Sequence, residues 1–402
     1  MPIGNCPTSK ECANFLVSLC SADASDWGVQ PGSLTAECSR QCGTLYRKTN
    51  MTAARFRKTN RRYASSTDVA QLAGVSQSAV SRAFSEGKSI SEETSRKVFE
   101  AAKKLGYRPN FLPRILFNHR SRLVAIAISD AANPFYASAL VKFTACLQET
   151  GHQVLLVHVE DGHALDSAIP RIARYRVDAI VSALPVLSKA AARALADIRV
   201  PTVAFNTPVK SPWISAICAD SIGGAVAVAD LFVKRGARSF AFIGGSDGSH
   251  ASLERRRGYE ERLRALGVSK VSFATGGFTY EGGLAAAEAL YAAGKPDAIF
   301  CANDLMAIGA IDALRDRLKL RVPQDVLVAG FDDIPQASWG AYSLTTVVQD
   351  SETMVAEAVS MLNTMISADG PKGKVVRTIA SKLVERQTTA SQLGAPYERR
   401  AQ

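Results

Sequence analysis

The sequence TDVAQLAGVSQSAVSRAFS at residues 67–85 decides the fold of the N-terminal part of this chain. Ser65 followed by Asp68 has the spacing of a capping box, which predicts that a helix begins there. Gly74 can adopt a positive φ and end that helix, and Ser76 can cap a second one. The stretch therefore predicts two short helices joined by a tight turn, as in a helix-turn-helix.

The second predicted helix has an apolar face and a polar face. Ala79, Val80 and Ala83 recur at helical spacing and are expected to point inward. Hydrogen-bonding side chains occupy the cap and the other face, where a recognition helix contacts base edges and phosphates. We expect five of these residues to bind DNA: Ser76, Gln77, Ser78, Ser81 and Arg82.

The excess positive charge lies around this helical pair. Residues 1–50 hold 4 Lys or Arg and 4 Asp or Glu, residues 51–122 hold 15 and 5, and residues 123–402 hold 29 and 28. The net charges are 0, +10 and +1, which together give the +11 of the whole chain. A basic segment binds a polyanion by neutralising phosphates and releasing counterions, although a solvated basic surface would have the same composition.

A third helix and a basic segment follow the pair. Ser91 with two glutamates after it predicts a helix start, and Gly106 predicts its end. Three such helices make a compact DNA-binding headpiece, which we expect over residues 65–109. The segment at residues 110–122 is either a plain linker or a hinge helix that inserts an apolar side chain into the minor groove.

From residue 123 on, apolar runs alternate with amphipathic stretches of helix length. The runs at 123–129, 154–159, 178–184 and 201–205 predict buried parallel strands, and those at 239–245, 297–304 and 326–333 predict a second set. This alternation predicts an α/β core of two doubly wound parallel sheets over residues 123–390. Small ligands bind such sheets at the carboxyl ends of their strands.

Polar residues gather at the predicted strand ends of both halves. Asn, Asp and Arg side chains together can hydrogen-bond a polyol, and an Arg can also hold a carboxylate or phosphate. A single Asn or Asp at a strand end is often only a turn or cap residue, so the convergence from both halves is what favours a small-molecule site. The residues are Ser129, Asp130, Asn133, Asn206, Asn303, Asp304, Asp332 and Asp333, with Arg255 at the start of a helix.

The first 64 residues are expected to be a disordered extension, and Met51 is a natural start for a shorter chain. Five of the 8 cysteines lie before residue 43, but their spacing matches no usual zinc site and no His precedes His119. We therefore expect neither a metal nor another cofactor. Because the N-terminus lacks a secretory signal and no apolar run reaches the about 20 residues of a membrane span, we expect a cytoplasmic protein.

Residues 66–390 resemble the LacI/GalR family of bacterial transcriptional regulators. The resemblance is carried by DVAQLAGVSQSAVSRAFS (68–85), NPFY (133–136), CANDLMAIGA (301–310), GFDDIP (330–335), LTTVVQD (344–350) and LVERQTT (383–389). It implies a helix-turn-helix headpiece, a hinge helix and a core like the periplasmic sugar-binding proteins. The N-subdomain would cover about residues 123–219 and 347–378, and the C-subdomain about 220–346 and 379–390, with 391–402 as a tail.

The resemblance also implies roles for individual residues. Gln77, Ser78 and Arg82 match base-reading positions, Asn110 belongs to the DNA-binding set, and Leu116 matches the hinge leucine that intercalates in the operator. The effector would be a small sugar, polyol or sugar acid, and Arg255 slightly favours an acid. The implied effector-binding residues are Ser129, Asp130, Asn133, Phe135, Asn206, Arg255, Phe278, Asn303 and Asp332.

Three positions depart from the family pattern. Pro113 replaces an alanine of the hinge, Thr207 an arginine, and Ser221 an asparagine after the first crossover. Pro113 is tolerated in a first helical turn but puts the hinge's contact with the groove in doubt. No heptad pattern follows Val384, so the resemblance implies a homodimer on a near-palindromic operator rather than a tetramer.

Two other classes of function compete with a regulator. The predicted core alone would also suit a solute-binding protein, but the missing export signal and the headpiece argue against it. An enzyme is disfavoured because the glycine cluster GGSDGS (244–249) fits neither a dinucleotide fingerprint nor a P-loop, and no His forms a motif with a nucleophile. Asp332 and Asp333 are adjacent, so their side chains diverge and do not make an acid/base pair.

Overall fold

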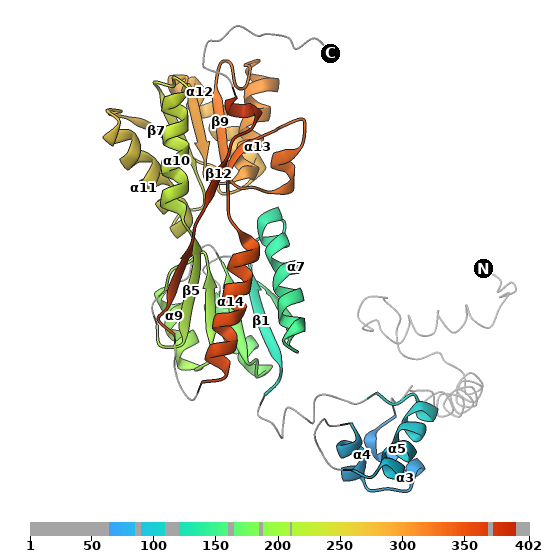
Figure 1. The fold of residues 1–402 in the computed structure, drawn as a ribbon. Helices are drawn as coiled ribbons and strands as arrows, with labels where there is room; N and C mark the ends of the chain where they lie inside the picture. The colour runs from blue at the N-terminus through green and yellow to red at the C-terminus, as the bar shows by residue number, and fades with distance from the viewer. Residues whose placement is uncertain are drawn as a thin grey trace, which may run out of the picture. The chain divides into compact units, whose positions relative to one another are not determined.

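Three short helices form the N-terminal part of the protein that the structure describes. The structure is a computed structural model, and it describes residues 64–84, 90–108, 120–159, 165–184, 188–209, 211–368 and 373–390. Helix α3 (Ser66–Ala73) has the predicted capping box, α4 (Gln77–Ala83) begins at the predicted cap Ser76, and α5 (Glu92–Leu105) begins after Ser91. The sequence-based prediction of these helices is confirmed (Figure 1).

The headpiece helices pack around a small apolar core. Its buried members come from all three helices: Val69, Ala70, Val80, Val98, Ala101 and Ala102. Phe84 adds edge-to-face contacts with Phe99 and Tyr107, whose ring centroids lie 5.0 and 5.6 Å away. Because this core is small, the headpiece is expected to be only marginally stable, so a small local change in stability is a large fraction of the total.

Gly74 forms that turn in the left-handed conformation, with φ 66° and ψ 35°. A β-carbon on Gly74 would meet no atom within 4 Å, so only the backbone conformation disfavours other residues. We expect Gly74→Val to cost about 1–2 kcal/mol of local stability, since a β-branched residue tolerates this region poorly. Amide exchange in residues 66–84 should speed up by about tenfold. Gly74→Asn, which tolerates the left-handed region, should change it much less, and equal effects of the two variants would contradict this explanation.

The core begins with a six-stranded parallel sheet. The sheet has the strand order β11-β5-β4-β3-β1-β2, and helices cover its two faces (Figure 1). Its strands are β1 (Leu123–Ile128), β2 (Gln153–His158), β3 (Ala179–Ala183), β4 (Thr202–Phe205), β5 (Ile214–Ala219) and β11 (Val376–Ile379). Its helices are α7 (Pro134–Glu149), α8 (Leu165–Arg174), α9 (Lys189–Asp197) and α14 (Ser351–Ile366). We call this half the N-subdomain.

The other half, the C-subdomain, repeats the architecture. Its sheet has the order β12-β10-β9-β8-β6-β7, parallel except for the pair β10 and β12. The strands are β6 (Phe240–Gly244), β7 (Val271–Thr275), β8 (Ala298–Cys301), β9 (Leu327–Asp332), β10 (Thr345–Val348) and β12 (Lys382–Val384). The helices are α10 (Ser221–Lys234), α11 (His250–Ala265), α12 (Tyr280–Gly294) and α13 (Asp304–Asp312).

The chain passes three times between the two sheets. These crossovers lie between β5 and α10, between β10 and α14, and between β11 and β12. The three connections place the carboxyl ends of β1, β4, β6, β8 and β9 around the space between the subdomains. This arrangement positions the candidate ligand site.

Several elements were not predicted from the sequence. Strands β5, β7, β10, β11 and β12 and helix α14 carried no assignment. Helix α13 ends at Asp312, and the chain continues as a π-helical segment, Ala313–Arg317. Strands β10, β11 and β12 have only three or four residues, and the residues of β7 are exposed or half-buried, so their local patterns are weak. Strand β5 has six mostly buried residues and was missed all the same. None of the helices in the described ranges is long and apolar enough to cross a membrane.

Candidate functional site

The first candidate site is the exposed face of α4. Five of the seven residues predicted to bind DNA are exposed on α4 and at its cap: Ser76, Gln77, Ser78, Ser81 and Arg82. The Ser76 hydroxyl accepts from the backbone N–H of Ala79 at 3.2 Å and lies 2.9 Å from the Ser78 hydroxyl, and the Gln77 amide donates to Ser66 Oγ at 2.9 Å. These contacts hold the first turn of α4 in place while its polar side chains stay accessible. The other two predicted DNA-binding residues, Asn110 and Leu116, lie outside the described residues, as does Pro113.

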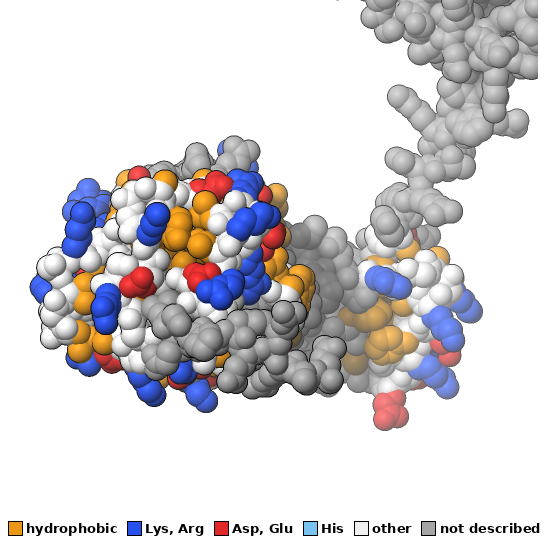
Figure 2. All heavy atoms as spheres, turned by 90° about the horizontal axis from the view of Figure 1, so that it is seen from above, with side chains coloured by type: hydrophobic (Ala, Val, Ile, Leu, Met, Phe, Trp, Pro, Cys, Tyr) orange, Lys and Arg blue, Asp and Glu red, His pale blue; other side chains and the backbone are white. Residues whose placement is uncertain are grey.

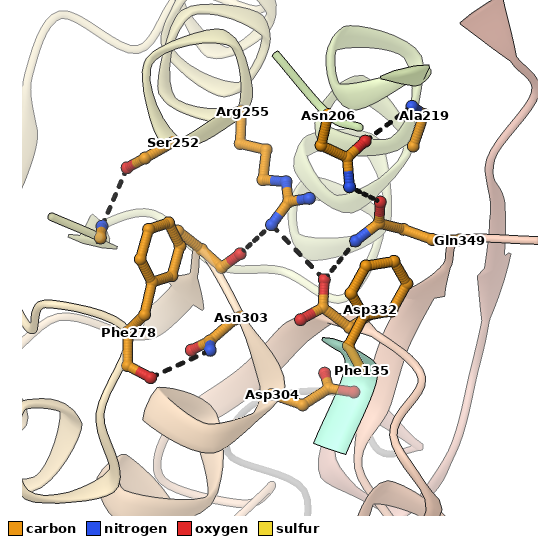
Figure 3. Close-up of polar contacts among 12 residues, drawn as sticks. Phe135, Asn206, Ala219, Ser252, Arg255, Phe278, Asn303, Asp304, Asp332 and Gln349 are labelled. Carbon is orange, nitrogen blue, oxygen red and sulfur yellow. Dashed lines mark hydrogen bonds and ion pairs between the residues drawn. The ribbon is translucent and has the colours of Figure 1, made fainter. Parts of the chain in front are cut away.

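The second candidate site lies between the subdomains and centres on Arg255 and Asp332 (Figure 3). Arg255, on α11, is only 3% exposed, and its Nη1 lies 3.6 Å from Oδ1 of Asp332 at the end of β9. The same Nη1 donates to the carbonyl oxygen of Ala302 at 2.5 Å, and the guanidinium carbon lies 3.7 Å from the centre of the Phe331 ring. Arg255 is therefore fixed by a carboxylate, a carbonyl and an aromatic face, while its buried Nε has no partner.

Burial sets the electrostatics of this ion pair. Asp332 is 7% exposed, and the loss of solvent raises its pKa to about 6, although Arg255 and the Gln349 amide lower it. Burial lowers the pKa of Arg255, which Asp332 counteracts. Partly buried Tyr136, on α7 beside this pair, has its pKa raised by burial and by Asp332. The sequence-based reasoning did not include Tyr136, although it belongs to the NPFY stretch.

Gln349 is a further residue that the sequence-based reasoning missed. Its Nε2 donates to Asp332 Oδ1 at 2.5 Å, and its Oε1 accepts from Asn206 Nδ2 at 2.8 Å. Asn206 in turn accepts from the backbone N–H of Ala219 at 3.0 Å. Figure 3 shows these side chains in one continuous line from the C-subdomain to the N-subdomain. The only sequence signal was the position of Gln349 in the quoted stretch LTTVVQD.

Asn303 and Phe278 form a tightly packed wall of the site. Asn303 caps α13 by accepting from the Met306 N–H at 3.0 Å, and it donates to the carbonyl of Phe278 at 3.1 Å. Phe278 has a positive φ of 66°, and a β-carbon on Gly245 would lie 2.1 Å from its ring. Only glycine at position 245 allows the ring this approach, and Asn303 is largely occupied by structural contacts.

The predicted residues of the N-subdomain lie at the end of β1 and the start of α7. Asp130 accepts from the backbone N–H of Asn133 at 3.1 Å, and Asn133 caps α7 by accepting from the N–H of Phe135 at 3.1 Å. Phe135 is buried and stacks against Phe205, with ring centroids 6.2 Å apart. Ser129 follows β1 directly and is partly buried. These contacts fix the first turn of α7 at the rim of the site.

Two other strand-end acids are committed to structural contacts. Asp304 is fully buried and accepts from the Thr346 hydroxyl at 2.6 Å and from the Ile334 N–H at 2.9 Å. Burial raises its pKa, and Asp332 adds to the effect. Asp333 forms an ion pair with Arg386, in which Oδ1 of Asp333 lies 2.7 Å from Nη2 of Arg386. Neither is free to act with Asp332 as an acid/base pair, and within the described residues no group of His, Cys, Asp or Glu is placed to hold a metal ion.

A cavity of about 470 Å³ at the second and third crossovers reaches Asp332, but Arg255, Asn206, Phe278 and Asn303 do not line it. It is bounded by the start of α7, by the turn after β9 and by two crossovers, and its lining includes Phe135, Lys142, Asp332, Gln349 and Lys382. Lys142 donates to the hydroxyl of Ser351 at 2.6 Å, which ties α7 to the start of α14. The space between the subdomains is thus large enough for a small ligand next to Asp332.

Comparison with known proteins identifies relatives for both parts of the chain. The family model for bacterial regulatory proteins of the lacI family matches residues 67–110, and that for a periplasmic binding protein-like domain matches residues 229–389. The transcriptional regulator CelR of Thermobifida fusca is 33% identical over 75% of this chain and 91% of its own length. AscG of Escherichia coli is 32% identical over 80% of this chain and 97% of its own length.

Solved structures agree with this assignment. A complex of CelR with cellobiose has a TM-score of 0.60 at 31% identity and covers 81% of this chain and 99% of its own. A lac repressor dimer bound to operator has the same fold, with a TM-score of 0.74 at 24% identity, over 82% of this chain and 99% of its own. With the headpiece geometry and the two-sheet core, these matches show that the chain belongs to the LacI family of bacterial regulatory proteins, which are DNA-binding transcriptional regulators.

Proposed function

We propose that this protein is a cytoplasmic, homodimeric repressor whose affinity for a near-palindromic operator is controlled by a small effector bound at Arg255 and Asp332. The observation that best supports this function is that one chain combines an exposed polar face on α4 with a buried ion pair of the C-subdomain. This pair faces the N-subdomain, to which three crossovers connect it. We further propose the division into a headpiece (65–109), a hinge (110–122) and a core (123–390). No catalytic role is proposed, because the acids of the site pair with Arg255, Thr346 or Arg386.

DNA binding is tested with fragments from upstream of the protein's own and neighbouring genes. A homodimer would place two copies of α4 in major grooves about one helical turn apart, so protection should cover two near-palindromic half-sites. The affinity should fall steeply as salt concentration rises, because phosphate contacts release counterions. Absence of salt-sensitive binding to any such fragment would refute the proposed function.

Arg82→Ala should relax base preference. Arg82 is exposed on α4 and can make a bidentate contact with a base edge, which is worth about 1–3 kcal/mol of discrimination. Binding to the operator should weaken by that amount in fluorescence anisotropy, and binding to random DNA should change little. Arg96→Ala, an exposed arginine on α5, serves as the matched control. Equal losses on operator and random DNA would make Arg82 a phosphate contact instead.

The contacts of Arg255 favour a neutral polyhydroxy effector over the sugar acid that the sequence slightly favoured. Arg255 is already neutralised by Asp332, and the carboxyl of Asp304 acts on it as well. An anionic effector would therefore compete with Asp332 for the same guanidinium. A sugar can instead accept from the guanidinium and donate to the carboxylate through hydroxyl groups, with its apolar face on Phe278.

Thermal unfolding of the protein with added sugars tests this effector class. Cellobiose, D-ribose and D-glucose are compared with D-glucuronate, which has a carboxylate in place of the C6 hydroxymethyl group of D-glucose. An effector at 100 times its Kd adds about 2.7 kcal/mol of stability. Stabilisation by a neutral sugar supports the proposal, whereas stabilisation by D-glucuronate alone would favour an acidic effector.

A further inference from the structure

We propose that Gln349 is a positioning residue that couples the carboxylate of Asp332 to the N-subdomain, so that any change at this carboxylate reaches the first crossover at Ala219. The coupling runs through four groups, which we call the amide relay: Asp332, Gln349, Asn206 and the backbone N–H of Ala219. The regulatory meaning of this coupling rests on the function proposed above. The physical coupling itself can be tested without DNA or effector.

The hydrogen bonds of the amide relay can run in only one direction. The N–H of Ala219 is a donor, so Asn206 must turn its oxygen toward Ala219 and its NH₂ toward Gln349. Gln349 must then accept through Oε1 and present its own NH₂ to Asp332. A backbone group at one end and a carboxylate at the other therefore fix the orientation of both amides, and neither amide can flip without losing two bonds.

The amide relay also joins two of the three crossovers. Ala219 ends β5 immediately before Asp220, which caps α10, and Gln349 lies between β10 and Asp350, which caps α14. All four residues are between 4% and 7% exposed, so water has little access to replace a lost bond. Asn206 and Asp332 have positive φ angles of 60° and 120°, which shows that the backbone holds them in uncommon conformations.

These features make Asp332 the only partner that the Gln349 NH₂ has in the relay. When Asp332 moves away from Gln349, the buried NH₂ of Gln349 loses its acceptor and is destabilised. The NH₂ of Gln349 can regain an acceptor only if the second crossover shifts. Asn206 and Ala219 must then move as well, because their hydrogen bonds depend on the position of Gln349. A side chain of similar length without the amide, Met, should therefore uncouple the two ends.

Amide hydrogen exchange at Ala219 in the full chain measures the coupling. Gln349→Met should accelerate exchange of the Ala219 N–H by about tenfold, since Asn206 is no longer oriented by Gln349. Thr207→Val is the matched control, because it removes a buried side-chain bond next to the relay, from Thr207 Oγ1 to the carbonyl of Leu184 at 2.8 Å. If the control accelerates exchange at Ala219 as much as Gln349→Met, the effect is general loosening and the proposal is wrong.

Transmission from Asp332 is tested by combining substitutions. Asp332→Ala should also accelerate exchange at Ala219, but in a Gln349→Met background it should add nothing further, because the connection is already broken. Effects that multiply would show two independent contributions and overturn the proposal.

A reversed pair provides a rescue that does not depend on a stable single variant. Gln349→Glu places two carboxylates in contact, whereas Gln349→Glu combined with Asp332→Asn restores a donor facing an acceptor at the same net charge. The double variant should return exchange at Ala219 to within about threefold of the wild type. Failure of this rescue contradicts the proposal, whereas failure to bind operator DNA would refute only the proposed function and leave these exchange rates as they are.

Discussion

Replacing Arg255 with Met should lower the free energy of unfolding by about 3–5 kcal/mol at pH 8, because it leaves the carboxylate of Asp332 buried without its counterion. The loss should be smaller at pH 5. Without Arg255 the pKa of Asp332 rises further, so the group is protonated there and carries no charge that needs a partner. Denaturant unfolding at the two pH values measures the difference.

Arg256→Met is the control for this prediction. Arg256 lies on the same helix, pairs with Glu260 at 2.7 Å and sits over the Phe273 ring, but it is much more exposed. A surface ion pair of this kind contributes about 0–1 kcal/mol, so its loss should be small and nearly independent of pH. If the Arg255→Met variant loses no more stability than Arg256→Met, Arg255 does not hold a buried charge. Arg255→Met should also abolish any stabilisation by the neutral sugar identified as effector.

Asp332 should make the protein less stable as the pH rises from about 4 to about 6. Its pKa is raised in the folded protein from 3.8 to about 6, so the folded state binds more protons than the unfolded state in this window. The contribution of protonated Asp332 to the free energy of unfolding is present at low pH. It is lost as the pH rises through the folded-state pKa of Asp332. The shift corresponds to about 3 kcal/mol.

Asp332→Asn tests this contribution through the difference in unfolding free energy between the wild type and the variant at several pH values. Because Asp332 also helps to raise the pKa of Asp304, this difference includes the change that the substitution makes in the titration of Asp304. The substitution removes the counterion of Arg255 only at pH values where Asp332 is ionised, and the folded-state pKa of Asp332 already includes that interaction. The difference should change by about 2 to 2.5 kcal/mol between pH 4 and pH 7, because pH 4 already lies slightly above the unfolded-state pKa of 3.8. A constant difference would mean that Asp332 titrates normally.

Local sequence signals accounted for much of the fold. The capping residues Ser65, Ser76 and Ser91 begin the predicted helices, and Gly74 and Gly106 end theirs in the left-handed conformation. Most of the apolar runs of the core became strands buried on both faces, which must be apolar throughout. The run at 154–159 was also predicted to be buried, but it forms the edge strand β2, whose residues are exposed or half-buried. The short strands β11 and β12 were missed because their residues are only partly buried and have no continuous apolar run.

The same reasoning found where a ligand site lies but not how its residues are used. Asp332 and Arg255 were both predicted, and the structure places them together. Asn303 and Asp304 were predicted on equal grounds, yet their polar atoms are largely occupied by helix-capping and loop contacts.

Figure 2 shows Lys and Arg side chains interspersed with Asp and Glu on the visible face of the core, consistent with the nearly balanced charge of residues 123–402.

The sequence by itself determined the helix-turn-helix, the alternation of strands and helices, and the edge of the sheets where polar residues collect. These depend on caps, turns and periodicity, which act over a few residues. Only the tertiary structure decided that Arg255 is neutralised by Asp332 and that Gln349 connects Asp332 to Asn206. These contacts join residues far apart in the chain, and their strength depends on burial, which is set when the three crossovers bring the two sheets together.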